Sequence, residues 1–496
     1  MTFSAVDWAL LAVAALLSAA LTLWTVRRSR RAITNWVDRA VLRAVHQFQV
    51  RLKRYRLVSK RSVRQQLLQD PLVVDAVREH SQEHGVSELD ARVRVERYID
   101  EIVPYFNVLS YYRLGYNLAR LLVHLFYRVS SEYQDRAALN AIPRRDVVVY
   151  LMNHRSNADY VVVAYVLAQA VSISYAVGEW ARVWPLEYVF KSFGSYFIRR
   201  GFREPLYHVV LERYIQLITR NGITQGIFLE GGLTRNGAFR PAKIGLLDYI
   251  VRTLNDLPAD RNVWLVPVAL NYDRVLEDRT LIMELLDRDT RPGRVRQLTT
   301  VVHYLFFNVM RLLTLSLKRY GRVAVNFGTP ISMRDWVRER PGVLEQPKED
   351  RLPQMQELAD DVMARIGDIL PVTPVPLVAA ALLSFGESVV RSDALLDRID
   401  EFRDHLLGRG AKLVQPERRP DIILDRAWRM LSMRRLAVHD HGSYVILPRQ
   451  RPLLEYYANS IRHLLPGTVY EPAMHPAREV DRHLPRLATE TRRRGR

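Results

Sequence analysis

Residues 146–160 read DVVVYLMNHRSNADY, in which an apolar run passes directly into a polar segment that contains a histidine and an aspartate. The β-branched residues of Val147–Met152 predict a buried strand, and the polar residues after it are typical of a strand-to-helix turn. His154 and Asp159 are five residues apart and would point in different directions on one continuous helix. They can meet if His154 lies in the turn and Asp159 in the first turn of the following helix.

Such a pair has the chemistry of a general base. The aspartate would hold the imidazole in one tautomer and stabilise the imidazolium, which leaves the other ring nitrogen to accept a proton. The chain has 13 histidines, so about one His-to-Asp spacing of five is expected by chance. The spacing alone is therefore weak evidence for a functional pair, and its position at the end of a strand is what supports one. Backbone N–H groups near the start of the next helix are the expected oxyanion site.

Strand-like and helical patterns alternate from about residue 145 onward. This alternation predicts an α/β fold with a mixed sheet flanked by helices, between helical N- and C-terminal regions. The expected strands are Val147–Met152, Ile173–Val177, Ser195–Arg199, Gly226–Glu230, Trp264–Ala269 and Val323–Phe327. The expected divisions are an anchor with its basic flank at 1–31, a helical region at 32–132, the α/β catalytic domain at 133–345, a second helical region at 346–470 and a basic tail at 471–496.

The N-terminus predicts one transmembrane helix. Residues 8–26 (WALLAVAALLSAALTLWTV) carry no charge, and a helix of that length spans roughly 28 Å at ~1.5 Å per residue. Four arginines follow at positions 27, 28, 30 and 31, whereas only Asp7 precedes the run. The positive-inside rule then places the rest of the chain on the cytoplasmic side of the cell (inner) membrane. A cleaved signal peptide would carry its positive charges before the apolar run.

The charge balance favours anionic partners. The chain has 73 Lys and Arg against 53 Asp and Glu, a formal net charge of +20. Anionic lipids, acidic carrier proteins and nucleic acid all fit such an excess. The absence of cysteine excludes disulfides, thiolate zinc sites and a cysteine nucleophile. Neither G-x-x-x-x-G-K-[ST] nor G-x-G-x-x-G is present, which disfavours a kinase or a dinucleotide enzyme.

Three further segments carry candidate binding residues. FGSYFIRRGF (193–202) places Arg199 and Arg200 at a strand end, where two guanidinium groups suit a phosphate or carboxylate, although an ordinary surface pair is the more common explanation. GIFLEGGLTRNGAFRPAKIG (226–245) suggests a cradle for a small phosphate ester, or else a hairpin-like turn with solvated basic residues. In that cradle Glu230 would hold a ligand hydroxyl or an arginine. In WLVPVALNYDRVLE (264–277), Pro267 interrupts an apolar strand and indicates an edge, a bulge or a lining role.

In this order, the four segments resemble the glycerophosphate acyltransferase family, and most closely its glycerol-3-phosphate acyltransferases of the bacterial and mitochondrial type. The resemblance extends to VSKRSVRQQLLQDPLV (58–73), GRVAVNFGTPISM (321–333) and VILPRQRPLLEYYANSIRHLL (445–465). It implies that His154 is the general base and Asp159 its orienting partner. It implies an acyl-site role for Pro267 and glycerol phosphate binding by Arg199, Arg200, Glu230, Gly231, Thr234, Arg235 and Lys243.

The expected function is transfer of a fatty acyl group from acyl-CoA or acyl carrier protein to the sn-1 hydroxyl of glycerol 3-phosphate, giving lysophosphatidate. No metal or cofactor is expected, since a thiolate is a good leaving group. Dihydroxyacetone phosphate or a lysophosphatidate are the alternative acceptors. Asn157, Ala158 and Thr234 depart from the residues usual in the family, which puts acceptor detail in doubt. A non-catalytic, membrane-anchored protein that binds lipids or nucleic acid is the alternative of another class; as an enzyme, the chain is expected to bind no nucleic acid.

Overall fold

The computed structural model describes residues 60–104, 116–167, 174–178, 187, 190, 191, 194–199, 201–286, 321–415 and 419–466. The predicted membrane anchor with its basic flank, Arg200 and the basic tail lie outside these residues. Within the described ranges, no helix combines the length and the apolar character that crossing a bilayer requires.

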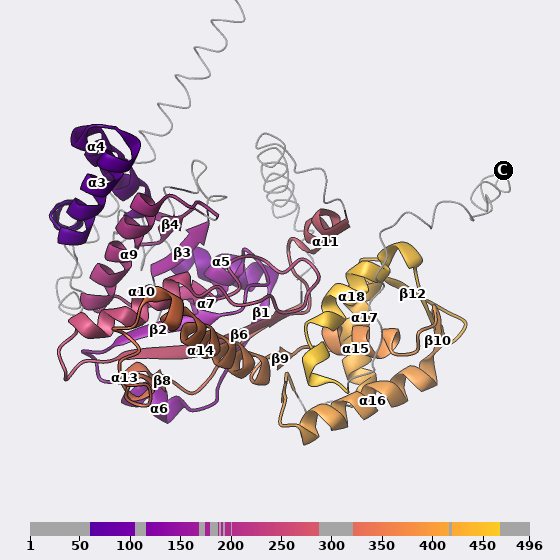
Figure 1. Ribbon diagram of the computed structural model, residues 1–496. Helices are drawn as coiled ribbons and strands as arrows, with labels where there is room; N and C mark the ends of the chain where they lie inside the picture. Colours follow the sequence, from indigo (N-terminus) through magenta and orange to yellow (C-terminus); the bar gives the residue numbers. More distant parts are fainter. Residues whose placement is uncertain are drawn as a thin grey trace, which may run out of the picture.

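A mixed sheet forms the centre of the α/β domain (Figure 1). Strand β6 pairs in parallel with β2 and antiparallel with β7 and β8, whereas β5, β3 and β4 continue the parallel part from β2. In their order across the sheet, the described strands are β1 (Arg128–Tyr133), β7 (Arg322–Phe327), β6 (Val263–Tyr272), β2 (Val147–Met152), β5 (Gln225–Phe228), β3 (Ser174–Gly178) and β4 (Tyr196–Ile198), with β8 (Ile331–Ser332) beside β6.

This sheet confirms the predicted α/β class. Each of the six expected strands is present, with bounds that differ by up to three residues except for β2, which has the predicted ones. β1 was not predicted: all but its last residue lie in the 32–132 segment expected to be helical. It pairs in parallel with β7 from Arg128↔Arg322 to Tyr133↔Phe327. Its sequence, RVSSEY, lacks an apolar run, so the sheet begins earlier in the chain than the sequence indicated.

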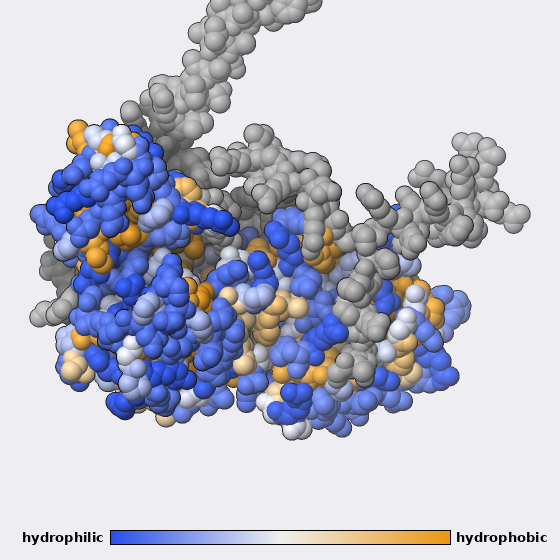
Figure 2. Space-filling view, viewed as in Figure 1, coloured by the Kyte–Doolittle hydropathy of each residue, from blue (hydrophilic) through white to orange (hydrophobic). Residues whose placement is uncertain are grey.

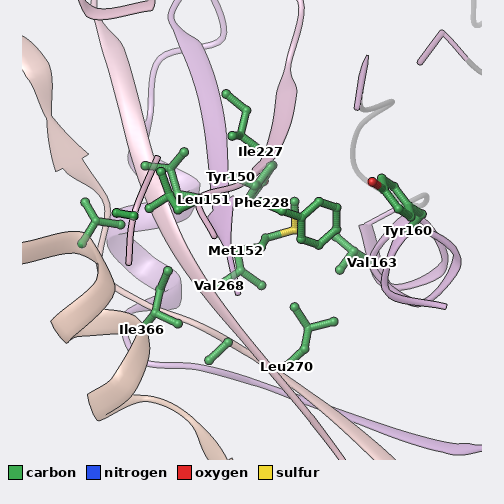
Figure 3. Packing of buried hydrophobic residues seen from close by; sticks show 14 of the residues in the cluster. Tyr150, Leu151, Met152, Tyr160, Val163, Ile227, Phe228, Val268, Leu270 and Ile366 are labelled. Carbon is green, nitrogen blue, oxygen red and sulfur yellow. The ribbon is translucent and has the colours of Figure 1, made fainter. Parts of the chain in front are cut away.

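Helices cover both faces of the central strands. Helix α7 (Asp159–Leu167) follows β2 directly, and α14 (Lys348–Asp368) contacts β6. Figure 3 shows Met152, Phe228 and Val163 packed together on the α7 side of the strands and Ile366 of α14 on the other side. All four side chains belong to the buried core.

The described N-terminal helices form a unit beside the sheet. α2 (Lys60–Leu68), α3 (Pro71–His84) and α4 (Glu88–Ile102) pack against α9 (Pro205–Arg220), as the indigo helices of Figure 1 show. Most of the visible face of the described residues is hydrophilic (Figure 2). Leu72 of α3 and Leu89 of α4 are among the exposed large apolar side chains of the described residues.

The C-terminal region is built around α15 (Pro374–Leu383), whose residues are all buried. Helices α16 (Ser392–Gly408), α17 (Pro420–Met433) and α18 (Arg451–Asn459) pack around it. This region was expected to be helical, but it also contains an antiparallel sheet of β10 (Val389–Arg391), β13 (Ser443–Ile446) and β12 (Ala437–Asp440).

A buried ion pair joins α14 to α10 (Gly245–Arg252). Arg351 donates from Nε and Nη2 to the two carboxylate oxygens of Asp248, at 2.7 and 3.2 Å, and both side chains are buried. Replacing Arg351 by Met should lower the free energy of unfolding by about 3–5 kcal/mol, because it leaves a buried carboxylate unpaired. Denaturant titration measures this loss. Arg338→Met, which breaks an exposed pair with Asp335, should cost less than about 1 kcal/mol, and equal losses in both variants would contradict the argument.

Candidate active site

At the start of the turn that carries His154, the side chain of Asn153 replaces main-chain hydrogen bonds of the β2–β6 pair. Asn153 donates from Nδ2 to the carbonyl oxygen of Leu270 at 3.0 Å and accepts from the Leu270 N–H at 2.8 Å. The amide thus imitates one more residue of the β2–β6 ladder, while the chain itself turns away. This turn lies at the carboxyl end of a central strand, where ligand sites of parallel sheets are commonly found.

The carboxylate of Asp159 organises the turn. Its Oδ2 accepts from His154 Nδ1 at 2.9 Å and from the N–H groups of Arg155 and Ser156 at 2.7 and 3.0 Å. Its Oδ1 accepts from the Tyr272 hydroxyl at 2.5 Å. The His–Asp contact predicted from the turn geometry is therefore present, and both side chains are buried, at 1% and 0% exposure.

These contacts also overturn one expectation. The N–H groups of residues 155–158 are bonded within the site: Asn157 donates to Glu277 Oε1 at 3.2 Å and Ala158 to Ser156 Oγ at 3.0 Å. The prediction that N–H groups at the helix start form the oxyanion site was wrong for these four N–H groups, because each already donates to an acceptor within the turn or to Glu277.

The imidazole is fixed by aromatic rings as well. It stacks on Phe228 of β5, with centroids 4.0 Å apart and planes 23° apart, and meets the Tyr160 ring edge-on at 5.6 Å. The Phe228 and Tyr160 rings also contact each other, with their centroids 4.8 Å apart. Neighbouring strand and helix therefore both restrict the rotation of the His154 ring.

Glu230 braces the turn rather than facing a ligand. Its Oε1 accepts from the His154 N–H at 2.9 Å and its Oε2 from the Arg240 N–H at 3.0 Å, and the side chain is 1% exposed. Burial raises the pKa of Glu230 to about 7, although the two hydrogen bonds act in the opposite direction. The expected contact with a ligand hydroxyl or an arginine side chain is thus replaced by two main-chain contacts.

The loop after Glu230 is folded tightly beside His154. Gly231 has φ +63, and a Cβ there would lie 2.8 Å from Cγ of Lys243. Thr234 donates from its N–H to the His154 carbonyl oxygen at 3.2 Å and from Oγ1 to the Ala238 carbonyl oxygen at 2.6 Å. The buried Thr234 hydroxyl therefore stabilises the loop through a hydrogen bond inside it, instead of facing a ligand.

The predicted cations differ in what they contact. Lys243 is exposed, and Arg235 is 55% exposed with Nε 3.2 Å from Glu284. The Arg199 guanidinium instead binds both oxygens of Glu101 in α4, at 2.7 and 2.6 Å. Arg199 also follows β4, three strands from β2, or roughly 14 Å across the sheet. The expected phosphate fork at Arg199 is therefore occupied by a carboxylate of the protein itself.

Pro267 lies inside the sheet at a break in the neighbouring strand. β6 pairs with β7 from Val268 onward and with β8 up to Leu265, so Pro267 faces the turn between them. Its carbonyl oxygen accepts from the Gly328 N–H at 2.8 Å on that side. The missing N–H of proline therefore lies where β6 has no paired strand residue on that side. The acyl-site role of Pro267 stays a prediction.

Sequence reasoning missed two residues that hold the turn. Tyr272 gave no signal, since its contact with Asp159 requires knowing that β6 lies beside β2. Glu277 closes the 264–277 segment, and its carboxylate accepts from Ser156 Oγ at 2.7 Å besides the Asn157 N–H. Burial raises the pKa of Glu277 to about 7. Among the described side chains, no group of three or more histidines and carboxylates could hold a metal ion.

Two segments of the chain match models of known protein families. Residues 137–271 match the family model described as Acyltransferase. The matched segment includes His154, Asp159 and the parallel part of the sheet. Residues 306–467 match the model described as Glycerol-3-phosphate acyltransferase C-terminal region, so the resemblance stated from the four segments is confirmed.

The chain spans about half the length of the curated relatives it matches. A glycerol-3-phosphate acyltransferase of Aeromonas hydrophila is 30% identical over 413 residues, 80% of this chain and 49% of that protein. One of Actinobacillus succinogenes is 27% identical over 425 residues, 83% and 50% of the two chains. A crystal structure of the 1-acyl-sn-glycerophosphate acyltransferase from Thermotoga maritima covers 51% of this chain and 78% of its own, but at a TM-score of 0.30 and 16% identity it supports no statement about the fold.

The raised pKa of Glu230 predicts how stability changes with pH. The folded chain holds this proton more tightly than the unfolded chain, because the pKa is about 7 instead of 4.5. The stabilisation is complete below pH 4.5 and is lost as the pH rises to about 7. The stability of the wild type relative to Glu230→Gln, which does not titrate, should fall over that range and level off above it. Thermal unfolding across a buffer series measures the difference, and parallel curves would contradict the assignment.

Proposed function

We propose that this chain transfers a fatty acyl group from a thioester to a hydroxyl of glycerol 3-phosphate. The observation that carries the proposal is the buried 2.9 Å hydrogen bond between His154 and Asp159 at the end of β2. The loop beside it presents the exposed cations Arg235 and Lys243, which suit a phosphate group. The similar proteins that carry the name glycerol-3-phosphate acyltransferase support the choice of this acceptor.

In the proposed reaction His154 acts as the general base. Asp159 accepts two main-chain N–H groups and a hydroxyl besides Nδ1, so Nδ1 donates and Nε2 takes the proton. The acceptor oxygen then attacks the thioester carbonyl carbon and a C–O bond forms. As the tetrahedral intermediate collapses, the C–S bond breaks, and the imidazolium returns its proton to the departing thiolate. No covalent enzyme intermediate is needed.

The loop cations contribute by placing the acceptor. Binding the phosphate at a fixed distance from His154 turns the attack into an effectively unimolecular step. Acyl-CoA and acyl carrier protein are both anionic donors, and the net charge of +20 suits either. We also propose that the chain acts at the cytoplasmic face of the cell membrane, because the uncharged run at 8–26 precedes four arginines.

Removing the base tests the proposal. His154→Ala should lower acyl transfer by about 10²–10⁴-fold, because the acceptor hydroxyl loses its proton acceptor. The assay follows radiolabelled glycerol 3-phosphate into the lipid fraction, with circular dichroism to check that the variant folds. His441→Ala is the matched control, since that side chain is 95% exposed; it should retain wild-type activity. A folded His154→Ala variant with the wild-type rate would reject the role.

An acceptor panel tests the substrate. Glycerol 3-phosphate, dihydroxyacetone phosphate and lysophosphatidate are each offered with acyl-CoA and with acyl carrier protein in detergent. Glycerol 3-phosphate should give the highest kcat/KM. A clear preference for another acceptor would support acyl transfer but contradict glycerol 3-phosphate as the substrate. No transfer to any acceptor would contradict the proposed function.

A further inference from the structure

The C-terminal region reaches the loop beside His154 through helix α18. Gly237 lies in that loop with φ +85, and a Cβ on it would lie 1.8 Å from the carbonyl oxygen of Tyr456. Asn459, one turn further along α18, donates from Nδ2 to the carbonyl oxygen of Asn236 at 2.8 Å. The main chain of two neighbouring loop residues therefore lies against one helix. Only glycine fits at position 237, where the two chains approach most closely.

The same helix reaches the catalytic turn through Arg155. The Tyr456 hydroxyl donates to the Arg155 carbonyl oxygen at 3.3 Å, and the Arg155 guanidinium carbon lies 5.3 Å from the centroid of the Tyr456 ring. From Nη1 this guanidinium donates to the carbonyl oxygen of Gly237. Arg155 thus bridges the turn that follows His154, the 234–238 loop and α18.

The side-chain contacts of Arg155 indicate whether it binds substrate or positions the loop. The side chain is 2% exposed, and Nε and Nη2 are buried without a hydrogen-bond partner among the described residues. Leaving such donors unpaired is costly, and neither Arg155 nor Tyr456 makes an ion pair in the described part of the chain. The described hydrogen bond of the guanidinium goes to the carbonyl oxygen of Gly237, so Arg155 acts through the loop that it binds.

We propose that Arg155 and Tyr456 form a latch through which the C-terminal region sets the position of the 234–238 loop relative to His154, and so the affinity for the phosphorylated acceptor. The inference rests on the proposed function, since it assigns the loop to acceptor binding. The Thr234 N–H already bonds the His154 carbonyl oxygen at one end of the loop. The latch fixes the other end at Gly237, so both ends are tied to the catalytic turn.

Two variants of the full chain test the latch by steady-state kinetics in detergent. Arg155→Met and Tyr456→Leu should each raise the KM for glycerol 3-phosphate about tenfold or more, because small displacements of a binding loop are costly. The KM for acyl-CoA should stay within about twofold of the wild type. The double variant should raise the acceptor KM no further than the larger single change, because both remove one shared unit. Tyr456→Phe keeps the ring under the guanidinium and should stay within about threefold of the wild type.

The control separates positioning from mere loss of stability. Trp428→Leu disturbs the packing of the C-terminal region, where the partly buried Trp428 ring lies 4.8 Å from the Tyr444 ring, centroid to centroid. It should lower the Tm and leave the acceptor KM unchanged. An acceptor KM that rises equally in this control, or stays within about twofold of the wild type in Arg155→Met, overturns the latch. If Tyr456→Leu does not fold, Arg155→Met decides alone. An inactive wild type would instead reject the proposed function.

Discussion

The site depends on one carboxylate that accepts four hydrogen bonds. Asp159 gathers an imidazole, two main-chain N–H groups and a hydroxyl around itself at the start of α7. All four donors are buried with it, so the ionised form is matched by donors on every side. The turn and the tautomer of His154 follow from this single arrangement. A neutral amide in its place would offer one acceptor atom to contacts that need two.

Two further carboxylates support the turn from outside. Glu230 links it to the loop after β5 and Glu277 to the segment after β6, and burial raises the pKa of each to about 7. Both are bound to donors of the protein itself. Three segments that are distant in sequence are thereby held at the carboxyl end of β2, and the C-terminal region joins them through α18. The turn that carries His154 is thus held in place by contacts from several segments.

The sequence predicted what depends on local pattern. The bounds of β2 and the meeting of His154 with Asp159 follow from an apolar run and a spacing of five, and both are observed. What it did not predict depends on strand order and on distant partners. Nothing near Arg199 indicated that Glu101 would occupy its guanidinium, and β1 has no apolar run of its own, since it lies at the edge of the sheet.

The tautomer of His154 is the most direct measure of the central claim. Nitrogen-15 NMR of the histidine-labelled chain, with the His154 signals assigned by difference from His154→Gln, reports which ring nitrogen carries the proton. The account predicts a neutral imidazole protonated on Nδ1 and bare on Nε2, and a loss of that preference in Asp159→Asn. A wild-type His154 protonated on Nε2 and bare on Nδ1 would contradict it.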